Sequence, residues 1–108
     1  MVRKLLGFLF TLIFTTSVAV GQSQYGRLQG TVTDEKTGEP VIGVNVTINV
    51  SGSTKGSVTS DGGEYEIAAI PPGKYDVTYS DVRYGRKILK DVEIGEGRTT
   101  VKDVALSS

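Results

Sequence analysis

Residues 59–79 read TSDGGEYEIAAIPPGKYDVTY, and this stretch decides the fold. In two short segments of it, every second residue is apolar or aromatic. These residues are Tyr65, Ile67 and Ala69 in the first segment and Tyr75, Val77 and Tyr79 in the second. A period of two places one set of side chains on a buried sheet face and the other set in water. The stretch therefore predicts two half-buried strands that are joined by the tight turn at Pro71-Pro72-Gly73.

The same period recurs in residues 44–50, where Val44, Val46, Ile48 and Val50 form the apolar set. Weaker strands are expected at residues 28–33, 57–59, 86–94 and 98–106, and turn compositions lie at 34–40, 51–56, 61–63, 71–73 and 95–97. Phase shifts within the last two strands predict bulges. No segment has a sustained helical period. The pattern predicts an all-β domain, an antiparallel Greek-key β-sandwich of about seven strands.

The first 21 residues have the features of a signal peptide. Arg3 and Lys4 precede an apolar run that ends at Val20, and small residues, Ala19 and Gly21, stand at −3 and −1 of the expected cleavage site. Cleavage after Ala19 is the alternative. An uncleaved anchor is disfavoured because the run is shorter than the roughly 20 residues that a spanning helix needs. We expect a signal peptide at 1–21, a short flexible lead at 22–26 and one domain at 27–106.

The composition argues against most catalytic chemistry. The chain has no Cys, His or Trp, and its 12 Lys and Arg residues balance 12 Asp and Glu residues. Without Cys and His it lacks a disulfide framework, a thiolate or imidazole metal site and a Ser-His-Asp triad. Removal of the signal peptide takes away two basic residues and no acid, so the remainder is mildly acidic and unlike a nucleic-acid binder. We therefore expect no enzyme activity, no cofactor and no metal.

The order of several short motifs resembles the carboxypeptidase regulatory-like domain, a transthyretin-like β-sandwich. The motifs are Gly30-Thr31-Val32-Thr33-Asp34, Thr37-Gly38-Glu39-Pro40, Gly43-Val44-Asn45-Val46, Thr59-Ser60-Asp61-Gly62-Gly63-Glu64-Tyr65 and Ile70-Pro71-Pro72-Gly73-Lys74-Tyr75-Asp76-Val77. One position departs from the family pattern, because Ser60 stands where the family usually has Asp. A serine hydroxyl caps a turn more weakly than a carboxylate.

The residues that carry this resemblance are interpreted as fold-specifying rather than ligand-binding. A glycine can adopt the positive φ of a tight turn, and a proline fixes an extended corner. A tyrosine can bury its ring while its hydroxyl reaches the rim. The set comprises Gly30, Asp34, Gly38, Pro40, Gly43, Gly63, Tyr65, Pro71, Gly73 and Tyr75.

A basic and aromatic cluster is the candidate ligand-binding site. It comprises Tyr79, Arg83, Tyr84 and Arg86, with Lys87 and Lys90 close by. An arginine stacked on a tyrosine would offer a platform for an anion or a sugar acid. The alternative is a solvated edge hairpin whose cations discourage edge-to-edge pairing. Asp61, Glu64 and Glu66 suggest a calcium loop, but their spacing is not that of an EF-hand, so solvated turn carboxylates are favoured.

The resemblance implies a non-catalytic interaction module. Similar domains stand at the N-terminus of outer-membrane TonB-dependent receptors and in secreted proteins of Bacteroidetes type, so we expect export to the periplasm, the outer membrane or the medium. Expected partners are a protein or a glycan of the cell envelope, with membrane association only through a receptor and no nucleic acid. The alternative function is a carbohydrate-binding module, because starch-binding-like domains share the sandwich. Peptidase activity is not implied, because it belongs to a separate zinc-bearing domain in carboxypeptidases.

Overall fold

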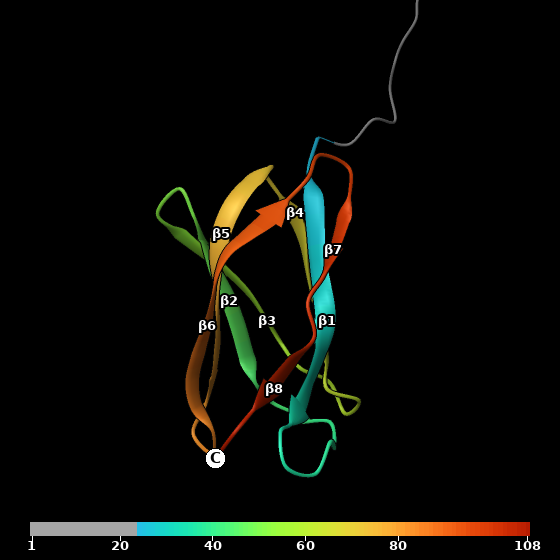
Figure 1. Ribbon diagram of the computed structural model, residues 1–108. Helices are drawn as coiled ribbons and strands as arrows, with labels where there is room; N and C mark the ends of the chain where they lie inside the picture. Colours follow the sequence, from blue (N-terminus) through green and yellow to red (C-terminus); the bar gives the residue numbers. More distant parts are fainter. Residues whose placement is uncertain (1–23) are drawn as a thin grey trace, which may run out of the picture.

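The computed structural model describes residues 24–108, so the predicted signal peptide and the start of the predicted lead lie outside the described residues. Within this range the chain forms eight strands and no helix. The strands are β1 (Gly26–Asp34), β2 (Asn45–Val50), β3 (Ser53–Val58), β4 (Glu64–Ile70), β5 (Gly73–Asp81), β6 (Gly85–Ile94), β7 (Thr99–Val101) and β8 (Val104–Leu106). They form two sheets that face each other (Figure 1).

The two sheets confirm the predicted β-sandwich, and they differ from the prediction in two details. The second sheet has the order β3-β2-β5-β6 and is antiparallel throughout. In the first sheet, β1 is antiparallel to β4 but parallel to both β7 and β8. The predicted strand at 98–106 is divided into β7 and β8, which both pair with β1. This sheet is therefore mixed, and the chain has one strand more than expected.

The core lies between the sheets and is built from the apolar sets that the alternation predicted, with one exchange and with Val50 and Tyr75 only partly buried at its margin. Ala69 is exposed and Ile70 is buried in its place, because a bulge in β4 shifts the phase. The register moves from Leu28↔Ile67 to Gly26↔Ile70, and Ala69 adopts a φ of 58°. The buried hydrophobic residues are Leu28, Val32, Val41, Val44, Val46, Ile48, Tyr65, Ile67, Ile70, Val77, Tyr79, Val92, Ile94, Val104 and Leu106.

A second bulge confirms the phase shift that was predicted within residues 86–94. The β5–β6 register passes from Val77↔Leu89 to Tyr75↔Val92, so β6 has one residue more than β5 over this interval. Asp91 has a φ of 55° there, and its N–H donates to Asp76 Oδ1 at 3.1 Å. Beyond the bulge, β6 bends toward β1 and β7 (Figure 1).

The turn between β2 and β3 is shorter than predicted. Only Ser51 and Gly52 lie in it, with φ angles of 50° and 84°, which is the pattern of a two-residue type I′ hairpin. Residues 53–56 belong to β3, although the sequence suggested a loop. Lys55 and Gly56 have low strand propensity, and the pairing of β3 with all six residues of β2 overrides it.

A buried chain of hydroxyl groups joins the two sheets. The hydroxyls of Tyr65 on β4 and Tyr79 on β5 lie 2.7 Å apart, and Tyr65 donates to the Lys102 carbonyl at 2.6 Å. Tyr79 therefore donates to Tyr65. Their rings meet edge to face with centroids 5.6 Å apart. Burial is the main cause that raises the pKa of both tyrosines.

The interruption between β7 and β8 follows from this chain of hydroxyls. In a regular parallel pair the Lys102 carbonyl would accept the N–H of Thr31. Here that carbonyl accepts from Tyr65, and Asp103 Oδ1 takes the Thr31 N–H at 2.9 Å. A Cβ atom at Gly30 would lie 1.8 Å from the Lys102 carbonyl oxygen. Only glycine at position 30 leaves room for the carbonyl to turn in this way.

Candidate binding sites

The turn between β5 and β6 holds the central pair of the predicted ligand-binding cluster. Asp81 Oδ1 accepts from the Arg83 backbone N–H at 2.7 Å and from its Nε at 2.9 Å, and Asp81 Oδ2 accepts from Nη2 at 2.9 Å. Arg83 Nη2 also donates to the Ile42 carbonyl at 2.7 Å. The hydrogen bonds from Arg83 hold the pKa of Asp81 below its usual value. Arg83 is thus fixed in place, although its side chain is 53% exposed.

Tyr84 connects this turn to the end of β1. Its hydroxyl donates to Asp34 Oδ2 at 2.7 Å, and Asp34 Oδ1 accepts from the backbone N–H groups of Lys36 and Thr37 at 2.7 and 3.1 Å. The bond from Tyr84, followed by these two backbone bonds, lowers the pKa of Asp34. The same Tyr84–Asp34 bond raises the pKa of Tyr84. Two loops that are 50 residues apart in the chain are locked together as a result.

Arg83 and Tyr84 form a small platform at this end of the sandwich. The guanidinium carbon lies 5.6 Å from the centroid of the Tyr84 ring, which is the range of a cation–π contact. A hollow beside the pair is also lined by Asp34, Thr37, Glu39, Pro40, Val41 and Ile42. The platform offers a planar cation, a partly buried aromatic ring and nearby carboxylates. These groups are suited to hydrogen bonds with a polar ligand.

Two members of the predicted cluster lie elsewhere. Tyr79 is completely buried and hydrogen-bonded to Tyr65, so it offers no face to a ligand. The alternation of β5 turns Tyr79 inward, so the prediction that it belongs to an exposed cluster is wrong. Arg86 is exposed on β6 and pairs in register with Ser80, on the outer face of the second sheet. The structure therefore brings together Arg83 and Tyr84 alone among the four.

The fold-specifying interpretation of the glycine and tyrosine motif has a local physical basis. Gly63 has a φ of 75°, and a Cβ atom there would lie 2.5 Å from the Val32 carbonyl oxygen. Tyr75 donates to the Pro71 carbonyl at 2.6 Å and closes the corner that Pro71 begins. The turn at Ser60 is closed by backbone bonds, from Gly63 N to Ser60 O and from Ser60 N to Glu64 O. These bonds do not involve the side chain at position 60.

Sequence reasoning missed the role of Thr59. This side chain is 3% exposed, donates to the Val41 carbonyl at 2.6 Å and accepts from the Val44 N–H at 2.9 Å. It fixes the entry to β2, so its role is structural. A threonine at the end of a weakly predicted strand gives no indication in the sequence that its hydroxyl bonds to residues 15 and 18 positions away.

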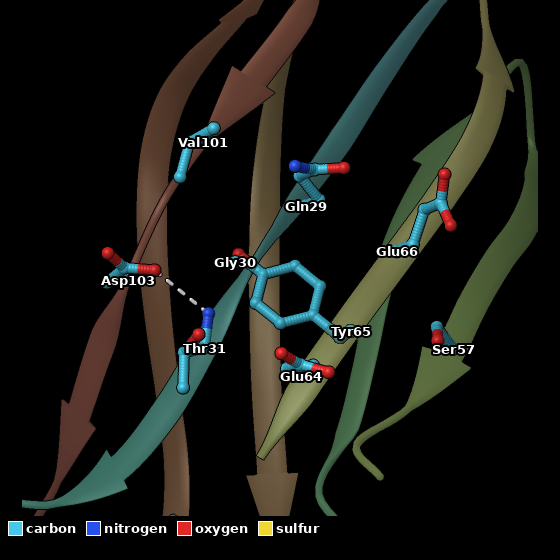
Figure 2. A pocket seen from close by; sticks show the side chains of 9 residues that line it. All are labelled: Gln29, Gly30, Thr31, Ser57, Glu64, Tyr65, Glu66, Val101 and Asp103. Carbon is cyan, nitrogen blue, oxygen red and sulfur yellow. Dashed lines mark hydrogen bonds between the residues drawn. The ribbon is translucent and has the colours of Figure 1, made fainter. Parts of the chain in front are cut away.

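A second hollow lies on the outer side of the first sheet (Figure 2). Cross-strand pairs Gln29↔Glu66 and Thr31↔Glu64 form its middle, and Asp103 lies beside Thr31. Ser57 reaches it from β3 of the other sheet. Arg27 pairs with Glu66 at 2.9 Å, and both side chains are half exposed.

The hollow is acidic because Glu64, Glu66 and Asp103 outnumber Arg27. Asp61, Glu64 and Glu66 are the residues whose composition suggests a calcium loop. Among residues 24–108, no group of three or more acidic side chains is arranged to hold a metal ion. Over the same range, no helix has the length and apolar character that crossing a membrane requires.

Solved structures with the same fold come from bacterial proteins. The TIE protein of Bacillus anthracis is 25% identical over 79% of this chain, with a TM-score of 0.67. A Bacteroides uniformis protein described as carbohydrate-binding is 21% identical over 74% of this chain, with a TM-score of 0.60. A type II cohesin–X-dockerin complex of Acetivibrio cellulolyticus is 22% identical over 73%, with a TM-score of 0.60.

The chain spans 17%, 40% and 52% of those three chains, so each of them contains further parts. No curated protein is similar enough to the chain to count as a match. The family model for the carboxypeptidase regulatory-like domain matches residues 27–107, which is nearly the whole described range. Its motif glycines, prolines and tyrosines lie where the sandwich needs them. The chain belongs to the carboxypeptidase regulatory-like domain family.

Proposed function

We propose that the chain is a non-catalytic interaction module of the cell envelope or the extracellular space. The observation that carries this proposal is the Arg83–Tyr84 platform, which two locked loops hold at one end of a rigid sandwich. Binding residues are often placed on loops that a rigid scaffold positions. Both groups keep part of their surface free for a partner.

The absence of catalysis is part of the same proposal. Three carboxylates at or beside the two hollows have structural roles, since Asp34 holds a turn, Asp81 holds Arg83 and Asp103 completes the pairing of β1. A general base needs a group that can take up a proton within reach of a nucleophile. The low pKa of Asp34 and of Asp81 works against that role.

We further infer that the module is exported and serves as the N-terminal domain of an outer-membrane TonB-dependent receptor. The signal-peptide features of residues 1–21, followed at once by this domain, support the inference. The names of the similar structures, which include a pilin subunit and a cohesin complex, are consistent with a surface location. The periplasm, the outer membrane and the medium are the compartments to be distinguished.

A carbohydrate-binding module is the second candidate. Tyr84 supplies a partly buried ring, and Arg83, Asp34 and Glu39 supply polar contacts around the same hollow. This is less aromatic surface than sugar stacking usually uses, because Tyr79 is buried. We therefore place protein recognition first.

The test compares purified residues 24–108 with the variant Arg83→Gln and with the control Lys74→Gln. Lys74 is exposed at the start of β5, and its substitution changes the charge equally. Binding is measured to separated envelope proteins and, by affinity electrophoresis, to polysaccharides. We expect Arg83→Gln alone to lose a protein partner. Retention on a polysaccharide alone would favour the second candidate, and turnover of a peptide or glycoside would refute both.

A further inference from the structure

The four outer edges of the two sheets are not equally protected. In the described residues, β4 and β6 each pair on one side only, and each contains a bulge, at Ala69 and at Asp91. The edge formed by β7 and β8 consists of two three-residue strands with a break between them. Bulges, short strands and charged side chains are the usual devices that prevent an edge from pairing with another chain.

Side chains add to this protection at the first three edges. Lys55 Nζ donates to the Ala69 carbonyl of β4 at 3.0 Å. Lys87 Nζ donates to the Ala105 carbonyl of β8, and Thr100 Oγ1 donates to the Glu93 carbonyl of β6. Backbone acceptors near these edges are therefore already occupied.

The edge of β3 lacks these devices. Its six residues keep an unbroken register with β2, without a bulge, a proline or a positive φ between Ser53 and Val58. Its single lysine, Lys55, is turned toward β4. No other described strand pairs with β3.

The backbone groups that β3 presents can be assigned from its hairpin. In a two-residue hairpin the residues that flank the turn, Val50 and Ser53, are a hydrogen-bonded pair, and pairing alternates from there. The N–H and C=O groups of Thr54, Gly56 and Val58 therefore point away from β2. They form a row of donors and acceptors that an extended chain can continue.

The acidic side chains beside this edge indicate which kind of peptide could pair with β3. Ser57 of β3 lines the same hollow as Glu64 and Glu66 of β4 (Figure 2). A strand added to β3 would direct alternate side chains toward that hollow. Residues two apart on a strand are separated by about 7 Å, and the two glutamates are themselves two apart on β4.

We propose that the free edge of β3 binds an extended peptide segment that carries Lys or Arg at alternate positions, opposite Glu64 and Glu66. A second copy of the chain fits less well. Its β3 would offer the acidic hollow only Lys55, which already binds the Ala69 carbonyl. This inference rests on the proposed function, because it names one surface and one partner chemistry for the interaction module.

The test uses residues 24–108, which contain both sheets and the whole described core, and two eight-residue peptides. One peptide alternates Thr with Lys, and the other alternates Thr with Glu. Backbone amide NMR shifts and hydrogen exchange locate any binding. We expect the Lys peptide alone to bind, with a Kd below about 1 mM, and to protect the amides of Thr54, Gly56 and Val58.

Three variants separate the backbone from the charge contribution. Thr54→Pro removes one outward N–H without breaking the β2 pairing, and it should abolish binding. Glu64→Gln with Glu66→Gln should weaken binding by about 3- to 10-fold and flatten its dependence on salt. Glu93→Gln with Glu96→Gln, the control, makes the same charge change near β6 and should have no effect. Folding of each variant is checked from its amide spectrum.

The inference is overturned if the Lys peptide does not bind, if the Glu peptide binds equally well, or if protection appears at β6 instead of β3. Self-association through β3, measured by sedimentation of the protein alone, would also overturn it. If the inference fails while Arg83→Gln still loses an envelope protein, the proposed function stands. If the peptide binds to β3 and the protein also turns over a substrate, the proposed function fails instead.

Discussion

Substitution of Tyr65 by Phe isolates the energetic role of the buried hydroxyl chain. The ring volume and the edge-to-face contact with Tyr79 are kept, and only the hydroxyl group is removed. Two partners then lose their hydrogen bonds, the Tyr79 hydroxyl and the Lys102 carbonyl. A buried polar group without a partner costs about 1–3 kcal/mol. We expect Tyr65→Phe to lower the free energy of unfolding by about 2–4 kcal/mol.

The reciprocal substitution, Tyr79→Phe, should cost less. It removes the donor to Tyr65, but Tyr65 still donates to Lys102, so no buried group is left without a bond. The expected loss is about 0.5–1.5 kcal/mol, which is the net value of one hydrogen bond. In the double variant the orphaned Tyr79 hydroxyl is gone as well. The double variant should therefore be no less stable than Tyr65→Phe alone.

Urea unfolding followed by far-ultraviolet circular dichroism measures all three variants, since this signal does not depend on tyrosine fluorescence. Tyr75→Phe is the control, because its bond to Pro71 is local and does not involve Tyr79. Its cost should add to that of Tyr79→Phe. If the Tyr65 and Tyr79 losses simply add, or if Tyr79→Phe is the more damaging change, the direction of the hydroxyl chain is wrong.

Three further predictions follow from the same strands. Unfolded tyrosine has a pKa of 10.0, and burial raises the pKa of Tyr65 and Tyr79 in the fold. Unfolding therefore releases their protons above pH 10, so the free energy of unfolding should fall as pH rises. The expected fall is about 1.4 kcal/mol per pH unit for each tyrosine. An alkaline titration in which the variant with both tyrosines replaced by Phe loses stability as steeply as wild type would contradict this. Gly30→Ala should lower the free energy of unfolding in urea by about 3 kcal/mol, because its methyl group clashes with the Lys102 carbonyl. Gly62→Ala is the control, since a Cβ atom there has space, and equal losses for the two variants would count against the clash. Asp91→Gly should raise the melting temperature, with a gain of up to about 1 kcal/mol, because it relieves a positive φ; no gain would mean that the bulge is unstrained.

The strands that the sequence predicts best are those in which the alternation is unambiguous. Residues 44–50 and 75–79 bury the apolar set that their period indicates, except that Val50 and Tyr75 are only partly buried. In residues 67–70, Ile, Ala, Ala and Ile stand together, so the period alone cannot say whether position 69 or 70 faces the core. The bulge resolves this in favour of the larger side chain, because Ile70 buries more apolar surface than Ala69.

The sequence pattern does not predict which distant strands pair with each other. The parallel alignment of β1 with β7 and β8 joins segments about 72 residues apart, and no local signal specifies it. The same limit applies to the candidate sites. Asp81 and Arg83 are two residues apart, so their ion pair could be anticipated, whereas the bond from Tyr84 to Asp34 depends on the fold.

Asp34 and Pro40 belong both to the motif and to the lining of the hollow beside Arg83, but the other motif residues have structural roles. Gly30 and Gly63 are required because a Cβ atom would collide with a carbonyl oxygen, and Tyr65 is required because it satisfies buried polar groups. These residues help to specify the sandwich whatever the protein binds. Thr54, Glu64 and Glu66 are exposed, and the core does not need them. Specificity can therefore change at such positions without loss of the fold, which is why the family motif indicates the architecture and does not identify the partner.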